Sequence, residues 1–563
     1  MQTTPQDTPP HPPQVPAGSP RIPGLDVWTL GVGAIALLIA SPVVVVLSSV
    51  FVSSGDVWSH LASTVLGTYI RNSLLLMVGV GLSVVGVGVA TAWLVTMCRF
   101  PASRWLEWAL LLPLAAPAYI LAYVYTELLD YYGPVQGALR AVFGWQRAQD
   151  YWFPNVRSLP GAIVLFTFTL YPYVYLLVRV AFLEQSVCTL EASRVLGCSP
   201  WQSFWRVAVP LARPAIAAGT ALALMETLSD YGTVAYFGVD TFTTGIYRTW
   251  FGMGDRPAAS QLAAVLMLFV AALVFLEQWF RRQARFYQAR STHQQMPRYQ
   301  LRGWRGAIAL LVCLLPLILG FLLPAAFLLQ MALQNLAQFS EARFWSFASN
   351  SLLLAGITAF IGVAIALLIA YGVRLRPSGP MLLSTRLATM GYAIPGSVIA
   401  VGVLVPLGAF DNALDAWMQR QFGISTGLLL SGTIAALVFA YLVRFLAVAL
   451  NTVEASLGRI KPSLDDAARS LGQNPFGTLR YVHAPLMASG LLTAGLLVFV
   501  DVMKELPATL IVRPFNFDTL AVRVYQLASD ERLVEAAAPA LAIVLVGILP
   551  VILLSRQIAR SRL

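Results

Sequence analysis

The stretch EASRVLGCSPWQSFWRVAVP (191–210) lies between two long apolar runs, and DAARSLGQNPFGTLRYVHAP (466–485) has the same setting 275 residues further along. Each stretch begins with helix-favouring residues and then meets a glycine, Gly197 or Gly472. Glycine readily adopts the left-handed conformation that ends a helix. The proline three residues later is well tolerated at the start of the next helix. Both stretches therefore predict a helix, a turn and a second short helix.

The composition of the chain predicts a membrane protein. Of its 563 residues, 58% are hydrophobic and 11% are charged, whereas a soluble domain has roughly 25% charged residues. A helix that crosses a membrane needs about 20 mostly apolar residues. The stretches that meet this requirement lie near 28–52, 72–98, 108–126, 158–178, 214–237, 258–276, 306–331, 350–373, 387–410, 427–443, 485–512 and 536–555. We therefore expect an all-α polytopic protein with twelve transmembrane helices.

The chain also repeats itself. NSLLL occurs at 72–76 and again at 350–354, and the two opening stretches match at several positions, including both glycines. The repetition predicts two tandem six-helix units, and an even number of spans gives both units the same orientation. The expected segments are a disordered cytoplasmic tail at 1–25, a first unit at 26–280, a basic cytoplasmic linker at 281–305 and a second unit at 306–563.

The net charge of +11 is explained by orientation in the membrane. If the N-terminus is cytoplasmic, most of the 37 lysines and arginines fall on the inner side, as the positive-inside rule requires. We therefore expect both termini and both opening stretches in the cytoplasm, and no nucleic-acid partner. The four cysteines and four histidines are dispersed along the chain, so we expect no metal site built from them.

The two opening stretches resemble the cytoplasmic loops of permease subunits of bacterial binding-protein-dependent ABC importers. In that family the loop forms a coupling helix that sits in a cleft of the ATP-hydrolysing subunit. The residues that carry the resemblance are Glu191, Ala192, Gly197 and Pro210 in the first copy and Asp466, Ala467, Gly472 and Pro485 in the second. The departures from the family pattern are Asp466 for Glu and Ser193 for Ala. The resemblance implies two ATP-binding cassette subunits, a periplasmic solute-binding protein and a place in the bacterial inner membrane.

A second resemblance concerns the cargo. Residues 226–263 and 501–532 resemble the fused permeases of ferric iron importers, which implies Fe(III) as the transported ion. Permeases for thiamine, polyamines, phosphonate and sulfate share the general plan, so another small solute is the alternative. An ion-coupled secondary transporter is a more distant one. The chain has no G-x-x-x-x-G-K-[ST] loop to hold ATP phosphates. We therefore expect no enzymatic activity and no bound cofactor in this chain, with ATP and Mg used by the partner subunits.

Charged residues interrupt the fifth apolar stretch of each unit. They are Glu226 and Asp230 in the first unit, and Asp501, Lys504 and Glu505 in the second. An ionisable group inside a membrane costs at least a few kcal/mol and marks a functional site by default. The spacing of four places both acids of a unit on one helix face.

Two roles for these charges remain open on the sequence alone. The carboxylates could line the route of a cation, since hard oxygen ligands suit a hard ion. Alternatively, Lys504 with Arg248 or Arg523 could neutralise the acids and latch the outer gate. In either case we predict a translocation path or gate here, with the binding protein docking above Arg248, Arg256 and Arg523.

Overall fold

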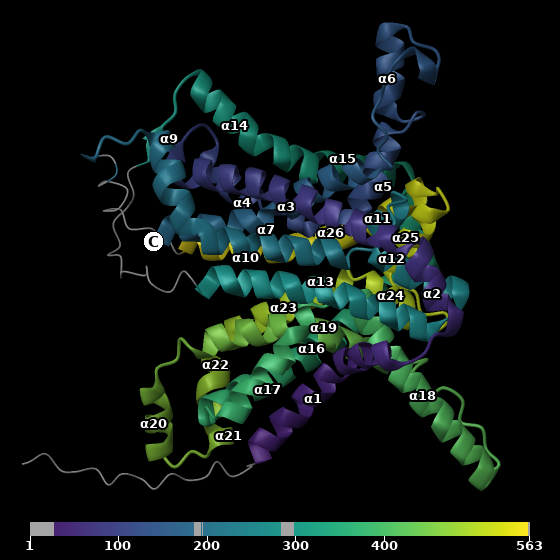
Figure 1. The fold of residues 1–563 in the computed structure, drawn as a ribbon. Coiled ribbons are helices and arrows are strands. Elements are labelled where there is room, and N and C mark those ends of the chain that lie inside the picture. Colours follow the sequence, from purple (N-terminus) through teal and green to yellow (C-terminus); the bar gives the residue numbers. More distant parts are fainter. Residues whose placement is uncertain (1–26, 185–192, 194, 283–297, 561–563) are drawn as a thin grey trace, which may run out of the picture.

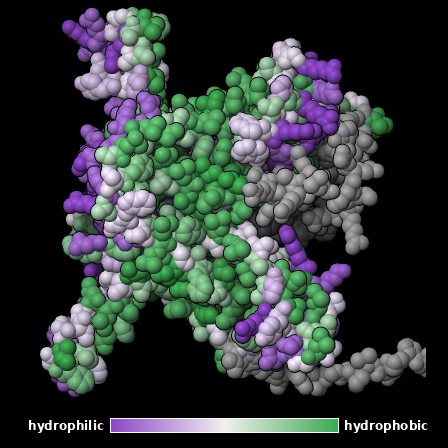
Figure 2. Space-filling model, turned by 180° about the vertical axis from the view of Figure 1, so that it is seen from behind, coloured by the Kyte–Doolittle hydropathy of each residue, from purple (hydrophilic) through white to green (hydrophobic). Residues whose placement is uncertain are grey.

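The computed structural model describes residues 27–184, 193, 195–282 and 298–560. Within them the chain is almost entirely helical, with one short two-stranded sheet. Ten helices are long and apolar enough to cross a membrane, and the number rises to twelve if two bent pairs each form one span. Figure 2 shows the resulting apolar band between two more polar ends. The prediction of an all-α polytopic membrane protein is therefore confirmed.

The first half of the described chain runs from α1 to α13. Its elements are α1 (Val27–Ser48), η1 (Ser49–Phe51), α2 (Gly55–Thr64), α3 (Leu66–Met97), β1 (Cys98–Arg99), α4 (Ser103–Ala109), η2 (Leu112–Ala115), α5 (Ala118–Leu129), α6 (Pro134–Phe143), η3 (Ala148–Asp150), α7 (Leu159–Glu184), α9 (Pro200–Ser203), η4 (Phe204–Ala208), α10 (Val209–Ser229), α11 (Gly232–Tyr236), α12 (Phe242–Tyr247), η5 (Arg248–Met253) and α13 (Arg256–Arg282).

The second half follows the same order. Its elements are β2 (Tyr299–Gln300), α14 (Trp304–Leu317), η7 (Ile318–Leu322), α15 (Leu323–Gln334), η8 (Leu336–Ser340), α16 (Ala342–Leu375), α17 (Gly379–Thr389), η9 (Met390–Ala393), α18 (Gly396–Phe422), α19 (Ile434–Leu457), α20 (Pro462–Ser470), α21 (Pro475–Thr478), η10 (Leu479–His483), α22 (Ala484–Leu486), α23 (Ala488–Met503), α24 (Pro507–Val512), α25 (Leu520–Ser529) and α26 (Leu533–Arg560).

The repeated NSLLL motif has the same structural role in both halves. Asn72 on α3 donates from its amide to the backbone oxygen of Asp240 at 2.9 Å, and Asn350 on α16 donates to that of Asp518 at 3.1 Å. Both bonds join the second long helix of a half to the loop before a short helix, α12 or α25. The repetition in the sequence is therefore also a repetition of contacts.

The two halves are interlocked at their first helices. Helix α1 packs on α17 and α18 of the second half, whereas α14 and α15 pack on α3, α4 and α5 of the first half. Figure 1 shows this exchange, with α1 lying along the green half and α14 along the blue one. The hydroxyl of Tyr125 on α5 also donates to the backbone oxygen of Leu319 in η7. Each half thus contributes its first span to the surface of the other.

A short parallel sheet ties the start of the second half to the first. Cys98 and Arg99, at the end of α3, pair with Tyr299 and Gln300. The backbone N–H of Leu301 continues this pairing by donating to the oxygen of Arg99 at 2.9 Å. The entry to α14 is therefore fixed against the end of α3.

The charge distribution and the fold together predict which side each loop faces. In a variant without reactive native cysteines, Asn155→Cys should react with an impermeant thiol reagent added outside intact cells, and Gln473→Cys should react only after permeabilisation. Both positions are exposed, Asn155 in the segment between η3 and α7 and Gln473 in the turn between α20 and α21. Labelling in the reverse sense would overturn the orientation.

Candidate functional site

The charged residues of the fifth span lie where the helices break. Helix α10 ends at Ser229 and α23 ends at Met503, and the short helices α11 and α24 follow directly. The expectation of one helix face holds for Glu226 and Asp230, since Asp230 is the C-cap of α10 and its N–H donates to the backbone oxygen of Glu226. It is wrong for Asp501 and Glu505, because Glu505 lies beyond Lys504, the C-cap of α23. The apolar stretch 214–237 contains most of α10 and all of α11, and 485–512 contains the end of α22 and all of α23 and α24.

Asp230 and Glu505 satisfy the backbone of the short helices. A carboxylate oxygen of Asp230 accepts from the backbone N–H of Thr233 at 2.8 Å, and one of Glu505 accepts from that of Ala508 at 3.0 Å. Unpaired N–H groups at the start of a helix are costly inside a membrane. These hydrogen bonds explain why an acidic residue is tolerated at this depth of the membrane.

All five predicted residues of the path or gate line one cavity between the two halves. The cavity has a volume of about 80 Å³, enough for a few water molecules. Its polar and charged lining consists of Tyr119, Thr169, Tyr173, Glu226, Ser229, Asp230, Tyr392, Arg444, Asp501, Lys504 and Glu505. Four carboxyl groups and two basic groups therefore face the same small space.

Four of these residues form two ion pairs. The Lys504 ammonium lies 2.9 Å from a carboxylate oxygen of Asp501, and the Arg444 guanidinium lies 3.2 Å from one of Glu505. Arg444 and Glu505 are both buried. Arg444 was not predicted, although it directly follows the charge-free stretch 427–443 and α19 continues past it to Leu457. A basic residue inside a helix of that length was the signal available in the sequence.

The arginines that the sequence suggested as partners of the acids are engaged elsewhere. Arg248 lies 2.6 Å from Asp240, and Arg523 stacks over the ring of Phe347. Arg256 stacks over Trp250. The part of the latch hypothesis that assigns Arg248 or Arg523 to the intramembrane acids is therefore wrong, whereas Lys504 does pair with an acid.

A cluster of three tyrosines lies at the end of the bundle opposite the two opening stretches, where α11, α12 and α25 are found (Figure 1). The rings of Tyr231 and Tyr247 stack with centroids 3.6 Å apart. The hydroxyls of Tyr231 and Tyr525 are 3.1 Å apart, and that of Tyr247 donates to the backbone oxygen of Pro507. These contacts, which we call the tyrosine cluster, join residues of the first half to residues of the second.

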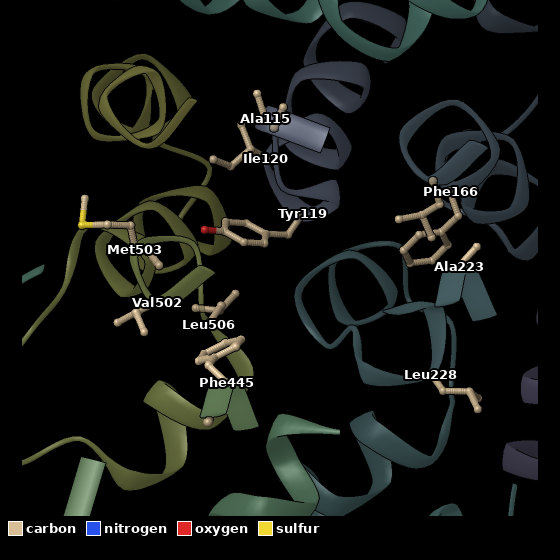
Figure 3. Close-up of a cluster of buried hydrophobic side chains, with 14 of the residues drawn as sticks. Ala115, Tyr119, Ile120, Phe166, Ala223, Leu228, Phe445, Val502, Met503 and Leu506 are labelled. Carbon is tan, nitrogen blue, oxygen red and sulfur yellow. The ribbon is translucent and has the colours of Figure 1, made fainter. Parts of the chain in front are cut away.

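Apolar packing also joins the two halves. A Cβ atom added at Gly232 would lie 2.6 Å from that of Tyr119 and 3.0 Å from a methyl group of Leu506. Figure 3 shows Tyr119 reaching from the first half toward Met503 and Leu506 of the second. The halves are thus in direct contact beside the cavity.

The second opening stretch forms the predicted helix, turn and short helix. Helix α20 ends at Ser470, Gly472 has a φ of +80°, and α21 begins at Pro475. The side chain of Asn474 accepts from the backbone N–H of Gly477 at 2.7 Å, which caps α21. Pro485 lies in α22, just before a bend of 77° that separates this segment from α23.

A polar cluster fixes α20 to the long helices. Arg374, near the end of α16, lies 2.6 Å from Asp465 and donates to the backbone oxygens of Leu457 and Ile460. His483 lies 2.7 Å from the same carboxylate. By contrast, the neighbouring Asp466 is exposed and contacts Arg469 in its own helix.

In the first opening stretch, Glu191 and Ala192 lie outside the described residues. Gly197 has a φ of +84°, and α9 begins at Pro200 with Ser199 and Gln202 forming a reciprocal cap. Pro210 lies in the first turn of α10, which continues without a large bend from η4. Several large apolar side chains of the two stretches are exposed: Val195, Leu196, Trp201, Trp205, Leu471, Phe476 and Tyr481. Such a patch on an otherwise polar end is typical of a protein interface.

Comparison with known proteins identifies this architecture. Residues 83–286 match the family model described as "Binding-protein-dependent transport system inner membrane component". The match shows that this part of the chain is similar to the inner membrane components of binding-protein-dependent transport systems. The permease is accordingly a multi-pass protein of the inner membrane that works with a binding protein.

Individual relatives are similar over most of the permease or over one half of it. It is 28% identical to the Fe(3+)-transport system permease protein FbpB 2 of Haemophilus influenzae, over 86% of this chain and 89% of that one. It is 25% identical to the putative ferric transport system permease protein FbpB 1 of the same organism, over 74% of this chain and 65% of that one. The molybdenum transport system permease protein ModB of Escherichia coli K12 is 25% identical over 35% of this chain and 86% of its own length.

The turn at Gly472 provides a test of the coupling loops. Gly472→Val should uncouple transport from ATP hydrolysis. The left-handed conformation costs an ordinary residue roughly 1–2 kcal/mol, so valine should abandon it and change the direction of α21. We expect uptake and binding-protein-stimulated ATP hydrolysis to fall while the amount of protein in the membrane is unchanged.

The matched control is Gly427→Val, since Gly427 also has a positive φ, of +61°, but lies in the loop between α18 and α19. Equal effects of the two substitutions would show that backbone strain alone is responsible.

The tyrosine cluster provides a second test. The double variant Tyr247→Phe/Tyr525→Phe keeps the rings and removes two hydroxyls that join the halves. Each neutral hydrogen bond contributes about 1 kcal/mol, so the equilibrium should shift toward separated halves by about thirtyfold. We expect ATP hydrolysis without binding protein to rise in the assembled complex.

Tyr132→Phe is the control, because that side chain is exposed. Unchanged basal hydrolysis in the double variant would exclude the tyrosine cluster as a gate.

Proposed function

We propose that the permease carries ferric iron, released by a periplasmic binding protein, into the cytoplasm by ATP-driven alternating access. Two ATP-binding cassette subunits would bind below, one at each coupling loop, and would hydrolyse the ATP. The chain itself would perform no chemical step. The relatives named for ferric transport support the cargo. The exposed apolar residues of the two loops that lie outside any described pocket, Val195, Leu196, Leu471 and Phe476, support the docking sites.

The observation that carries the choice of cargo is the set of four carboxyl groups on one cavity. Hard carboxylate oxygens suit a hard, highly charged cation. Sulfate or phosphonate would meet like charges in the same place, and electrostatic repulsion would oppose their passage. A cationic cargo is therefore the better match to this lining.

The cavity is also suited to passage rather than storage. In the described part of the chain, no three His, Cys, Asp or Glu side chains are grouped so that they could hold a metal ion. A conducted ion must leave as well as enter, so weak and distributed contacts favour transport. We infer that the ion moves past single carboxylates and is never fully enclosed by them.

The conformation suggests the order of events. The tyrosine cluster closes the cavity on the side where the binding protein would dock. Closure of the two ATPases would bring the coupling loops together and separate the halves at this cluster. The binding protein would then release its ion over the acids, and hydrolysis would restore the closed arrangement.

Uptake into proteoliposomes tests the cargo and the energy source together. The complex of permease, ATPases and binding protein should accumulate radioactive Fe(III) when ATP is present and no ion gradient is imposed. ATP-dependent uptake of sulfate, phosphonate, thiamine or a polyamine instead of iron would overturn the cargo. Uptake driven by a proton or sodium gradient without ATP would overturn the importer mechanism.

Glu226 offers the sharpest test of the path. Within the described part of the chain its carboxylate forms no hydrogen bond or ion pair, unlike those of Asp230, Asp501 and Glu505. Glu226→Gln preserves size and removes the charge, so uptake should fall about tenfold, equivalent to about 1.4 kcal/mol of lost attraction. Basal ATP hydrolysis should not change.

The matched control is Glu127→Gln, on α5 and outside this cavity. Raised basal hydrolysis in Glu226→Gln would favour the latch, and normal uptake would exclude Glu226 from the path.

A further inference from the structure

A second, larger cavity lies on the outside of the bundle, between α3, the segment after the first coupling loop, and α14. Its volume is about 460 Å³. The wall is almost entirely apolar, and it includes Trp93, Trp201, Trp205, Ile308 and Val312, with Arg305 as the charged member. We call this space the α14 groove.

The pseudo-symmetric position in the other half is closed. There, Trp28 on α1 packs edge-on against Tyr371 on α16, with ring centroids 6.1 Å apart. The corresponding residues at the α14 groove are Trp304 and Trp93, offset by 276 and 278 residues. The neighbouring helix α17 also packs along α1.

At the α14 groove the two tryptophans have separated. The ring of Trp93 packs on Phe182 and Phe204 instead, and the side chain of Trp304 is 69% exposed. Helix α14 leans away from the bundle at this end (Figure 1). Trp28 and Tyr371 thus fill the space between their helices, whereas the equivalent Trp304 and Trp93 leave an apolar space between α14 and α3.

Basic side chains surround the mouth of the α14 groove. Arg305 stacks on Trp304, and Arg302 is held by Gln300 at 3.0 Å. Arg99 is exposed beside them in the short parallel sheet. No acidic residue lines the groove in the described part of the chain. The sheet fixes this basic edge at the end of the bundle that carries the coupling loops.

We propose that the α14 groove binds a phospholipid with an anionic headgroup from the cytoplasmic leaflet. One acyl chain lies along the apolar wall between α3 and α14, and the phosphate contacts Arg305 and Arg302. Basic pockets between transmembrane helices on the cytoplasmic side bind anionic headgroups. Tryptophans are enriched at this depth of a membrane, where an apolar body meets polar headgroups.

The position of the groove gives the lipid a structural role. Trp201, Phe204 and Trp205 belong to the segment that directly follows the coupling turn at Gly197, and all three line the groove. A bound acyl chain fills the space between this segment and α14. The lipid therefore supports the first coupling loop in the way that direct helix packing supports the second half.

The test uses the full permease in nanodiscs of phosphatidylcholine that contain a minor fraction of phosphatidylglycerol with a photoreactive acyl chain. We expect cross-links to peptides that contain Trp93 and Ile308. Arg302→Gln/Arg305→Gln should lower the apparent affinity about thirtyfold, since each basic residue near a membrane surface contributes about 1 kcal/mol. Arg386→Gln, on α17 of the sealed half, should have no effect.

A second variant tests whether the acyl chain enters the groove, independently of the charge of the arginines. A Cβ at Gly86 would meet nothing within 4 Å, so Gly86→Phe should fill the groove without disturbing the helix and should abolish these cross-links. Gly356→Phe on α16 is the matched control, because its Cβ is equally free.

Three outcomes would overturn the proposal. Cross-linking that Gly86→Phe leaves unchanged would mean that the lipid does not enter the groove. Equal labelling by a photoreactive phosphatidylcholine would remove the anionic specificity. Peptide-to-peptide cross-links between the groove and another segment of the permease, found in place of lipid cross-links, would identify a different occupant.

Discussion

The breaks in the helices at Ser229 and Met503 impose the constraint on which the centre of this permease depends. A helix that ends inside the membrane leaves backbone groups that no water can satisfy. Asp230 and Glu505 accept hydrogen bonds from the first turns of α11 and α24 and so allow the chain to change direction. Because each break needs an acid and both breaks lie at the interface of the halves, the acids gather around one cavity.

The same arrangement connects the cavity to the two opening stretches, 191–210 and 466–485. In the first half, α9, η4 and α10 form one helical run from Pro200 to Ser229, so a displacement of the first stretch would move the wall of the cavity directly. In the second half a 77° bend separates the loop from α23. There Asp465 contacts Arg374 and His483, so a displacement of α20 would be passed to α16 and to the segment before the bend. Two different structural links therefore serve two equivalent loops.

Much of the fold could be predicted because its signals are local. Apolar runs predicted the spans, and the glycines at 197 and 472 predicted left-handed turns that the structure contains. The repeat predicted the common order of elements. The helix breaks were missed because apolar residues continue through them. Only the acids indicate that backbone N–H groups at the start of a new helix need hydrogen-bond acceptors. Arg444 was missed because the charge-free stretch 427–443 predicts a span that ends one residue before it, whereas α19 continues to Leu457.

Other features could not be predicted because they depend on contacts between distant segments. Nothing in the local sequence of α1 or α14 indicates that each packs on the opposite half. The ion pair of Arg248 with Asp240 also depends on the tertiary structure. The position of Arg248 along the sequence therefore suggested the wrong partners, the intramembrane acids. The roles of the coupling loops and of the acids in transport remain predictions.

Fusion of the two units in one chain has a physical consequence for their surfaces. Two identical subunits around an axis present identical surfaces to the membrane, whereas fused copies can differ at equivalent positions. Trp28 and Tyr371 seal one side through ring packing, while Trp304 and Trp93 stand apart on the other. By contrast, the core contacts made by Asn72 and Asn350 are equivalent in the two halves. At these positions the two copies have diverged at the surface, while the paired asparagine contacts are kept.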